Sequence, residues 1–215
     1  MTSKINEIQL IEGKITVVTG LHIGAGDTEM HIGGTDNSVI KNAVTDEPYI
    51  PGSSLKGKMR SLLRLYEGTD DNGDHIVKLF GAPAGKESKD VKPSCLSFWD
   101  CFLTPEWKSE IIKKQMPYTE VKMENKISRA TGTAEHPRTM ERVLPGAEFG
   151  FKLTVKIYEG ENRENIQNLV LKTLKLLEMD ALGGSGSRGY GRIKFKDLKM
   201  GEQDIQSELD KMKLF

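Results

Sequence analysis

The most regular hydrophobic pattern in the chain is the alternation of apolar and other residues from Phe149 to Ile157. A period of two is that of a β-strand with one buried face, so this segment predicts a strand. Three further segments are short and rich in β-branched or aromatic residues, and they predict strands at residues 11–18, 96–102 and 193–196.

Apolar residues recur at helical spacing in two longer segments. The first follows Pro51-Gly52-Ser53-Ser54, where a serine is expected to cap the helix, and continues to Tyr66. The second runs from Ile166 to Leu177. Shorter helices are predicted at residues 74–80, ending at Gly81, and after Thr104-Pro105-Glu106, which supplies a cap and a proline in the first turn.

Taken in order, the elements are strand, helix, strand, then strand, helix, strand. This order predicts an α+β fold with a ferredoxin-like (RRM-like) βαββαβ core. The sheet of such a core is one of the surfaces on which proteins bind single-stranded RNA. The stacking aromatic residues of an RRM are not evident here, so RNA is expected to lie along loops and along the basic helix that starts near Gly52.

Two segments interrupt this core. Residues 67–95 are acidic and punctuated by glycine, and we read residues 67–118 as an inserted helical lobe in which the helix after Thr104 packs on the preceding insertion. Residues 119–147 have no clean period, and a segment of that length between regular elements is typical of an extended functional arm. Its apolar tip candidates are Ala134, Pro137 and Met140. Residues 1–215 are otherwise expected to form a single domain.

The composition places few other limits on function. The chain has two cysteines and no C-x-x-C pair, which argues against a disulfide scaffold and a structural zinc site. It contains no apolar run of the length that a membrane span needs and no signal-peptide core, so a cytoplasmic protein without membrane contact is expected.

The net charge is zero, yet the charges are segregated along the chain. Residues 52–64 carry four basic residues and no acid, and residues 186–199 carry five basic residues against Asp197 alone. Acidic residues collect in residues 67–74 and 202–210. Separate patches of this kind are compatible with a groove for a polyanion on one face.

Five glycines and two arginines lie within residues 182–192. We expect this glycine run to provide positive φ angles or a bare backbone for a ligand and not to serve packing. With Arg188 and Arg192 beside them, exposed amides form an anion-binding concavity, and a phosphate backbone is the expected ligand. A flexible connection is the alternative. The spacing G-x-G-x-x-G is present, but a helix precedes it and a strand follows, which excludes the dinucleotide fingerprint.

The N-terminus of the basic helix is a second candidate phosphate site. Gly52 to Lys58 matches the spacing of a P-loop, but Met59 stands where a magnesium-binding hydroxyl is required, which argues against an NTPase. A helix N-terminus flanked by basic side chains remains suited to a phosphate group. His22 could contact a phosphate as well, but a structural role is at least as well supported by the sequence.

Four motifs in order resemble the RAMP superfamily of CRISPR-associated proteins, and in particular the repeated backbone subunit of type III-A effector (Csm) complexes. They are Val18-Thr-Gly-Leu-His22-Ile-Gly, the segment from Ile50 to Arg60, Leu79-Phe-Gly81, and the glycine run of residues 182–192. The resemblance covers about residues 8–199. Each motif alone is moderately specific, and their common order makes the resemblance strong.

The resemblance implies a subunit of an antiviral defence complex that polymerises along CRISPR RNA (crRNA). Its partners would be crRNA and target RNA, copies of itself in a filament, and other subunits of the Csm complex. Residues 119–147 would contain a thumb hairpin that passes through the guide–target duplex. Together with the basic patches, the resemblance nominates as RNA-binding residues His22, Ser53, Ser54, Lys56, Lys58, Arg60, Arg129, Arg138, Gly186, Arg188 and Arg192.

Family members also cut the paired target RNA with an aspartate in the loop after the first strand. The alignment of Ile32-Gly-Gly-Thr-Asp36 assigns that role to Asp36, with Asp27 as the competitor close to the strand end. Such a carboxylate can assist attack of a neighbouring 2′-hydroxyl or hold a divalent ion, and Mg²⁺ or Mn²⁺ is the expected cofactor. No ligand set for the metal is assigned.

Two other functions stay open at this point. The chain could be a non-catalytic scaffold for crRNA, or it could be a guide-processing RNA endonuclease of the same superfamily. Processing enzymes are expected to have a site centred on histidine, and the four histidines of this chain are scattered, which disfavours that reading. The presence of Asp36 favours a cleaving subunit over a scaffold.

Overall fold

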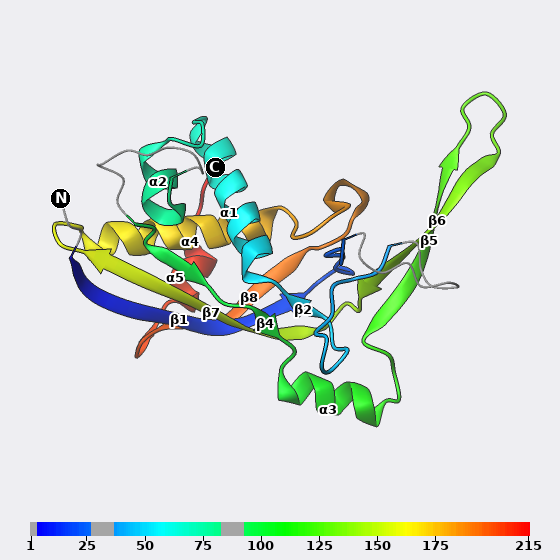
Figure 1. Ribbon diagram of the computed structural model, residues 1–215, viewed down its shortest axis with the longest axis horizontal. Coiled ribbons are helices and arrows are strands. Elements are labelled where there is room, and N and C mark those ends of the chain that lie inside the picture. The colour runs from blue at the N-terminus through cyan, green and yellow to red at the C-terminus, as the bar shows by residue number, and fades with distance from the viewer. Residues whose placement is uncertain (1–3, 27–36, 83–92) are drawn as a thin grey trace.

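The computed structural model describes residues 4–26, 37–82 and 93–215 (Figure 1). Its centre is an antiparallel five-stranded sheet in the order β3 (Leu96–Phe98), β7 (Glu148–Tyr158), β1 (Ile5–Val17), β8 (Ile193–Met200) and β9 (Gln203–Asp204). The strands predicted at residues 11–18, 149–157 and 193–196 are confirmed as β1, β7 and β8. The first strand starts at residue 5 and not at residue 11, because its early residues pair with β7 as far as Tyr158.

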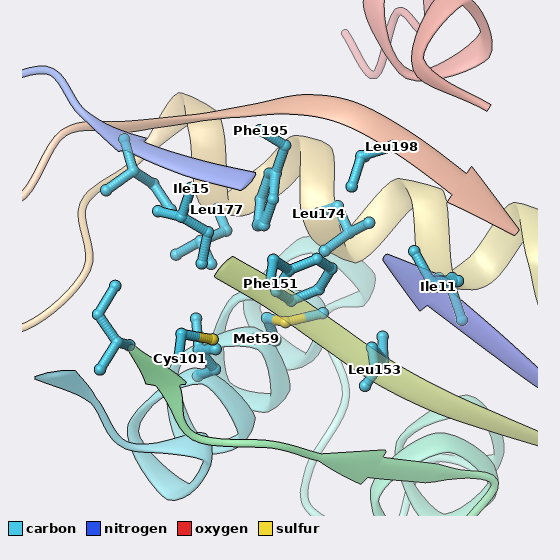
Figure 2. Close-up of a cluster of buried hydrophobic side chains, with 14 of the residues drawn as sticks. Ile11, Ile15, Met59, Cys101, Phe151, Leu153, Leu174, Leu177, Phe195 and Leu198 are labelled. Carbon is cyan, nitrogen blue, oxygen red and sulfur yellow. The ribbon is translucent and has the colours of Figure 1, made fainter. Parts of the chain in front are cut away.

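Helices cover one face of this sheet. The helix α1 (Gly52–Glu67) and the helix α4 (Arg163–Met179) are the two long helices predicted from the sequence, and the shorter α2 (Asp74–Phe80) and α5 (Gln206–Lys211) accompany them (Figure 1). The core between the two layers contains Ile15, Phe151, Leu153 and Phe195 from the strands and Met59, Leu174 and Leu177 from α1 and α4 (Figure 2).

The segment of residues 67–118 is not one inserted lobe. Its strand β3 belongs to the main sheet, and β4 (Cys101–Phe102) pairs with the short β2 (Tyr49–Ile50). The strand predicted at residues 96–102 is therefore broken at Trp99 and Asp100.

The helix α3 (Pro105–Lys113) has the predicted cap, since the Thr104 side chain accepts a hydrogen bond from the Trp107 amide. The expectation that this helix packs on the preceding insertion is wrong, because α2 and α3 lie on opposite sides of the molecule (Figure 1). Instead Trp107 packs on Tyr118, and Lys108 pairs with Glu47.

The predicted arm contains a two-stranded hairpin that extends away from the main sheet (Figure 1). It consists of β5 (Thr119–Ile127) and β6 (Ala134–Val143), joined by a turn in which the Ser128 amide donates to the Thr133 carbonyl and Gly132 has φ 71°. Met140 is not at the tip, as the sequence suggested. It is 8% exposed and lies near the base of the hairpin, beside Asn37.

Within the residues that the structure describes, no helix is both long enough and apolar enough to cross a membrane.

Candidate nucleic-acid interface

The start of α1 is held by a side chain from another segment. The Gly52 amide donates to Asp100 Oδ1 at 2.7 Å, and Pro51 occupies the cap position without a side-chain cap bond. The predicted serine cap is therefore wrong. A Cβ at Gly52 would lie 2.9 Å from the Phe98 carbonyl oxygen, so the close contact with the β3–β4 corner requires glycine. Ser53 is exposed and Ser54 half-buried, which leaves both hydroxyls near the helix N-terminus.

The basic residues of α1 differ in their environments. Lys58 Nζ lies 2.6 Å from Asp180 Oδ2, and Arg60 Nε lies 3.3 Å from Asp71 Oδ1. Lys56 is half-buried and forms no ion pair with the residues that the structure describes. The acids that partner α1 thus lie outside the helix, Asp71 just after its end and Asp180 far along the chain, and Lys56 is the cation best placed to accept a phosphate as its partner.

Two glycines of the glycine loop (residues 182–192) allow close packing of backbone against backbone. Gly183 has φ 76°, and a Cβ there would lie 2.2 Å from the His22 carbonyl oxygen. Gly191 has φ 69°, and a Cβ there would lie 1.9 Å from the Leu182 carbonyl oxygen. Both glycines have the positive φ that the sequence predicted. The expectation that glycines of this loop do not serve packing is wrong for these two, because a side chain at Gly183 would clash with the backbone of His22 and one at Gly191 with the backbone of Leu182.

The outer part of the glycine loop is exposed. Gly186, Arg188 and Arg192 all face solvent, and a Cβ at Gly186 would lie 2.9 Å from the Ala181 Cβ atom. Arg188 Nε lies 3.2 Å from Glu124 Oε2, and Arg192 Nη1 donates to the Met179 carbonyl at 3.2 Å. Both guanidinium groups keep free donors, because each has five N–H groups in total.

Tyr190 joins the glycine loop to the hairpin. Its ring is fully buried, with Lys122 Nζ 4.6 Å and Arg142 Cζ 5.0 Å from the ring centroid, and its hydroxyl donates to Glu124 Oε1 at 2.7 Å. The hydrogen bond from Tyr190 lowers the pKa of Glu124, and Arg188 adds to this effect. Burial, together with the Glu124 carboxylate, raises the pKa of Tyr190 to about 12.

His22 is 8% exposed and its Nδ1 is hydrogen-bonded to the Glu141 carbonyl oxygen at 2.6 Å. Its own carbonyl accepts the Gly184 amide at 2.8 Å. His22 therefore links the base of the hairpin to the glycine loop, which agrees with the structural alternative stated for this residue.

The Glu141 carboxylate fixes the segment that follows residue 36. Its Oε2 accepts the Val39 amide at 2.9 Å, and its Oε1 lies 2.7 Å from Thr119 Oγ1 and 3.0 Å from Lys41 Nζ. Burial by itself raises the pKa of Glu141, but the hydrogen bonds from Thr119, Val39 and Lys41 outweigh it and the pKa is lowered. The segment after residue 36 is therefore held at the base of the hairpin by an ionised, hydrogen-bonded carboxylate.

A cleft of about 590 Å³ lies between the hairpin and the glycine loop. Its lining residues are Asn37, Glu124, Asn125, Lys126, His136, Arg138, Met140 and Arg188. The cleft brings Arg138 and Arg188 together, whereas Arg129 lies at the exposed hairpin turn. Asp36 and Asp27 lie outside the described residues. Asn37 is the first described residue after Asp36, and its backbone carbonyl accepts a hydrogen bond from the Glu141 amide at 2.9 Å.

Several residues of this interface were missed in the sequence. Lys126, His136 and Glu124 lie in a segment without a clean period, so no pattern singled them out. Tyr190 could have been found, since a lone aromatic residue among glycines suggests an anchor for the loop.

The described residues do not form a metal site. Within them no group of three histidine, cysteine, aspartate or glutamate side chains is placed to hold a metal ion. The one carboxylate of the cleft, Glu124, is already engaged by Tyr190 and Arg188.

A profile of the RAMP superfamily matches residues 14–194. A protein of Methanothermobacter thermautotrophicus named CRISPR system Cms endoribonuclease Csm3 is 40% identical, over 92% of this chain and 87% of its own. A protein of the same name from Streptococcus thermophilus is 41% identical, over 90% of this chain and 91% of its own.

Two solved structures are similar in fold. A chain of the Csm3–Csm4 subcomplex of the type III-A CRISPR–Cas interference complex is 31% identical, with a TM-score of 0.60 over 99% of both chains. A chain of the type III-B Cmr-β complex bound to cognate target RNA has a TM-score of 0.64 at 18% identity, and this protein spans 61% of it. The latter likeness concerns the fold alone.

Proposed function

The chain belongs to the RAMP superfamily, and we propose that it is a crRNA-binding backbone subunit of a type III-A CRISPR interference complex, with endoribonuclease activity on the paired target RNA. The observation that carries this proposal is the identity of about two residues in five with curated endoribonucleases, over most of this chain and most of theirs. The role belongs to antiviral defence, and a cytoplasmic location is part of the proposal because the guide and target transcripts are found there.

The core is proposed to be ferredoxin-like. The order β3-β7-β1-β8, with α1 between β1 and β3 and α4 between β7 and β8, is the arrangement expected of a βαββαβ unit in which the first strand lies centrally. The whole chain would form one RAMP domain, and the hairpin of β5 and β6 would be its thumb.

The guide RNA is proposed to run from α1 over the glycine loop to the base of the hairpin. The ion pair of Lys58 with Asp180 places α1 beside the start of this loop, and Tyr190 holds the other end of the loop against β5. Lys56, Arg188 and Arg192 offer positive groups along this path. Ser53 and Ser54 at the helix N-terminus suit a phosphate, since unpaired amides and the helix dipole favour an anion there.

The proposal implies RNA and protein partners. The RNA partners are crRNA and target RNA, and the protein partners are further copies of the chain and other subunits of the Csm complex. Copies would join head to tail along the guide, because unlike faces that pair repeatedly form an open filament. The solved relative in the Csm3–Csm4 subcomplex supports contact with another subunit type.

Cleavage of the target is proposed to take place at the cleft between the hairpin and the glycine loop. Arg138 and Arg188 would hold the scissile phosphate and offset the charge that develops on it. Asp36, which precedes the cleft residue Asn37 in the sequence, would accept the proton of the attacking 2′-hydroxyl. As the 2′-oxygen bonds to phosphorus, the bond from phosphorus to the 5′-oxygen of the next nucleotide would break, which gives a 2′,3′-cyclic phosphate and a 5′-hydroxyl that takes its proton from solvent. The Glu141 carboxylate would keep the following segment in place by its bonds to Val39 and Lys41.

A divalent ion, Mg²⁺ or Mn²⁺, is proposed as a cofactor on chemical grounds, since it would neutralise charge at the phosphate. The described cleft residues do not fit a metal cage, so no step is derived through the ion. Loss of cleavage with a chelator, and its return with Mg²⁺ but not with a monovalent salt, would support the cofactor.

The experiment that tests the function is reconstitution of the complex with guide RNA, partner subunits and a complementary target. Cleavage of the target at regular intervals that depend on this subunit supports the proposal. Binding without any cleavage would instead favour the scaffold alternative, and cleavage of the guide precursor by the isolated chain would favour the processing alternative.

A further inference from the structure

The face of the main sheet opposite to the helices, here called the outer face, is open and polar. Phe151 and Leu153 of β7 point to the core, so the residues that alternate with them, Gly150, Lys152 and Thr154, belong to the outer face. In the registers of β1, directly opposed residues share a face, so two rows cross the outer face from β7 through β1 to β8: Lys152, Glu12 and Lys199, and then Gly150, Lys14 and Lys196.

Trp99 lies at the β3 edge of the outer face. It is 51% exposed, and its Nε1 donates to Thr154 Oγ1 at 3.0 Å, which holds the ring beside β7. Lys152 Nζ lies 5.9 Å from the ring centroid. A large apolar ring held in one orientation and left half-exposed is typical of a binding surface, where tryptophan is enriched.

The charge of the outer face is positive. The paired positions of β7, β1 and β8 place six lysines there, namely Lys14, Lys152, Lys156, Lys194, Lys196 and Lys199. Three carboxylates lie among them in the described strands: Glu12 pairs with Lys152 at 2.8 Å, Glu148 lies 3.4 Å from Lys14 and 3.9 Å from Lys196, and Asp204 of β9 lies opposite Lys199. Lys194 reaches Glu178 of α4. The lysines of the outer face outnumber the carboxylates that they contact, and this excess of positive charge suits a polyanion.

Gly150 gives the outer face a bare patch beside Lys14. It lies inside β7, where glycine weakens a strand, and the pairing with β1 is regular on both sides of it. A Cβ at this position would meet only the Phe102 carbonyl oxygen at 3.9 Å, an ordinary contact. The chain itself therefore gives no steric reason for glycine, and a strand glycine commonly marks the close approach of a ligand.

We propose that the outer face binds single-stranded RNA, with a base stacked on Trp99 and phosphates held by Lys14, Lys152 and Lys196. Aromatic side chains on an open sheet, flanked by cations, are used in this way because every base has a flat face to stack. Bases in a guide–target duplex are stacked on one another and are exposed only at the duplex ends, so the ligand is single-stranded. The outer face is separate from the proposed guide path over α1 and the glycine loop. That the ligand is RNA rests on the proposed function.

The sequence indicates a sheet of this kind but no stacking aromatic residue on it, because Trp99 falls inside the strand predicted at residues 96–102. The break of that strand after Phe98 leaves the indole on the sheet edge.

The test uses the full chain with the guide RNA that it retains. Trp107 is the second of the two tryptophans and is buried, so Trp107→Phe leaves Trp99 as the single fluorescent reporter. Titration with a 12-nucleotide oligouridylate is expected to quench this fluorescence. In a separate binding assay with a labelled oligonucleotide, Trp99→Ala is expected to weaken binding about tenfold, as for the loss of one stacked base.

Matched variants distinguish the loss of base stacking from a general effect of substitution on RNA affinity. Trp99→Phe keeps a flat ring and is expected to retain most of the affinity, and Lys14→Gln with Lys196→Gln is expected to reduce both affinity and its salt dependence. Phe215→Ala removes an exposed aromatic ring elsewhere, 90% exposed, and should change nothing.

Unquenched Trp99 and equal affinity of Trp99→Ala, in protein that still retains guide RNA, would overturn the outer-face proposal and leave the proposed function standing. If the Trp99 fluorescence changed with protein concentration and not with oligonucleotide concentration, the outer face would be a contact between copies of the chain. That result would also overturn the outer-face proposal. Protein that retains no guide RNA, with Trp99 still quenched, would count against the proposed function instead.

Discussion

The hydroxyl of Tyr190 donates a hydrogen bond of 2.7 Å to the carboxylate of Glu124, and this bond joins the glycine loop to the first strand of the hairpin. The two residues are 66 positions apart, and the ring of Tyr190 is fully buried beside the cationic groups of Lys122 and Arg142. Because Arg188 also pairs with Glu124, one carboxylate sets the position of the loop against the hairpin. The orientation of the hairpin is thus coupled to the conformation of the loop.

Removing this hydroxyl should destabilise the protein in a manner that depends on pH. Tyr190→Phe keeps the ring and is expected to lower the free energy of unfolding by about 1 kcal/mol at neutral pH, the usual net value of one hydrogen bond. Urea unfolding of the RNA-free protein at several pH values measures this loss.

The sign of the pH dependence follows from the two pKa shifts. The pKa of Glu124 is lowered, so its contribution is present above the ordinary carboxyl value and is lost as pH falls through the lowered value. The pKa of Tyr190 is raised to about 12, so its contribution is present below the ordinary phenol value and is lost as pH rises through about 12. The difference between wild type and Tyr190→Phe should therefore be largest near neutrality and shrink in acid. An equal difference at pH 3 and pH 7 would contradict the link.

Two glycines of the same loop provide a matched pair for the packing role. Gly183→Ala introduces a Cβ 2.2 Å from the His22 carbonyl oxygen at φ 76°, whereas Gly189→Ala adds a Cβ with nothing within 4 Å at a similar φ of 85°. Both variants carry the cost of about 1 kcal/mol or more for a positive φ, and only the first carries a clash. Thermal unfolding should show the larger loss for Gly183→Ala, and equal losses would remove the packing argument.

The strands and long helices could be predicted because their apolar positions follow a period that burial enforces. Phe149 to Ile157 alternates because one face meets the core, and the two long helices present apolar stripes to the same core. The sequence predicted the hairpin only as an extended arm, because its apolar positions follow no clear period. Its exposed apolar residues Val121, Met123 and Ile127 face solvent in this chain, so no buried face imposes a pattern on them.

The candidate site was harder to predict, because its charges are paired by tertiary contacts. Asp71 pairs with Arg60, and Asp180 pairs with Lys58. Neither acid lies three or four residues from its partner, so helical spacing does not reveal the pairs. The serine cap failed for the same reason, since Asp100 from another segment binds the first amide of α1. Motif order and segregated charge therefore indicated candidate elements for RNA binding, but not which of their cations lack an ion pair in the described part of the chain.

Lys56 should contribute more to RNA binding than Lys58. Lys58 is paired with Asp180, while Lys56 has no ion pair in the described part of the chain. For a single-stranded RNA, loss of one phosphate contact should reduce the slope of log affinity against log salt by about 0.7. Lys56→Gln is expected to show this change, and Lys58→Gln a smaller one. Titrations at several salt concentrations measure both slopes, and a larger effect of Lys58→Gln would reverse the assignment.

Shortening the hairpin should separate guide binding from target cleavage. The deletion must spare Met140, which is buried near the base, so we replace residues 127–134 by Asn-Gly, a two-residue turn that suits the register of Lys126 with Glu135. The melting temperature and the amount of retained guide RNA are expected to stay close to wild type. Target cleavage in the assembled complex should slow or shift in position. Cleavage at the same sites and rate would exclude the thumb role of the hairpin.

Replacing Asp36 should abolish target cleavage and leave assembly and target binding nearly unchanged. The proposed guide contacts of Lys56 and Arg192 are remote in sequence from Asp36 and lie outside the lining of the cleft, so binding and cutting should be separable. Loss of a positioned acid–base group commonly costs about 10²- to 10⁴-fold in rate, and Asp36→Asn keeps the size of the side chain while removing its charge. Because the attacking group is proposed to be the 2′-hydroxyl of the target, a single deoxy substitution at the scissile nucleotide should have the same effect as the variant. Cleavage rates, target affinity and melting temperature are measured on the same complexes, with Asp27→Ala as the control that keeps cleavage. If Asp36→Asn lowered affinity and melting temperature together with cleavage, the residue would be a turn former, and if the deoxy target were cut normally, water would be the attacking group.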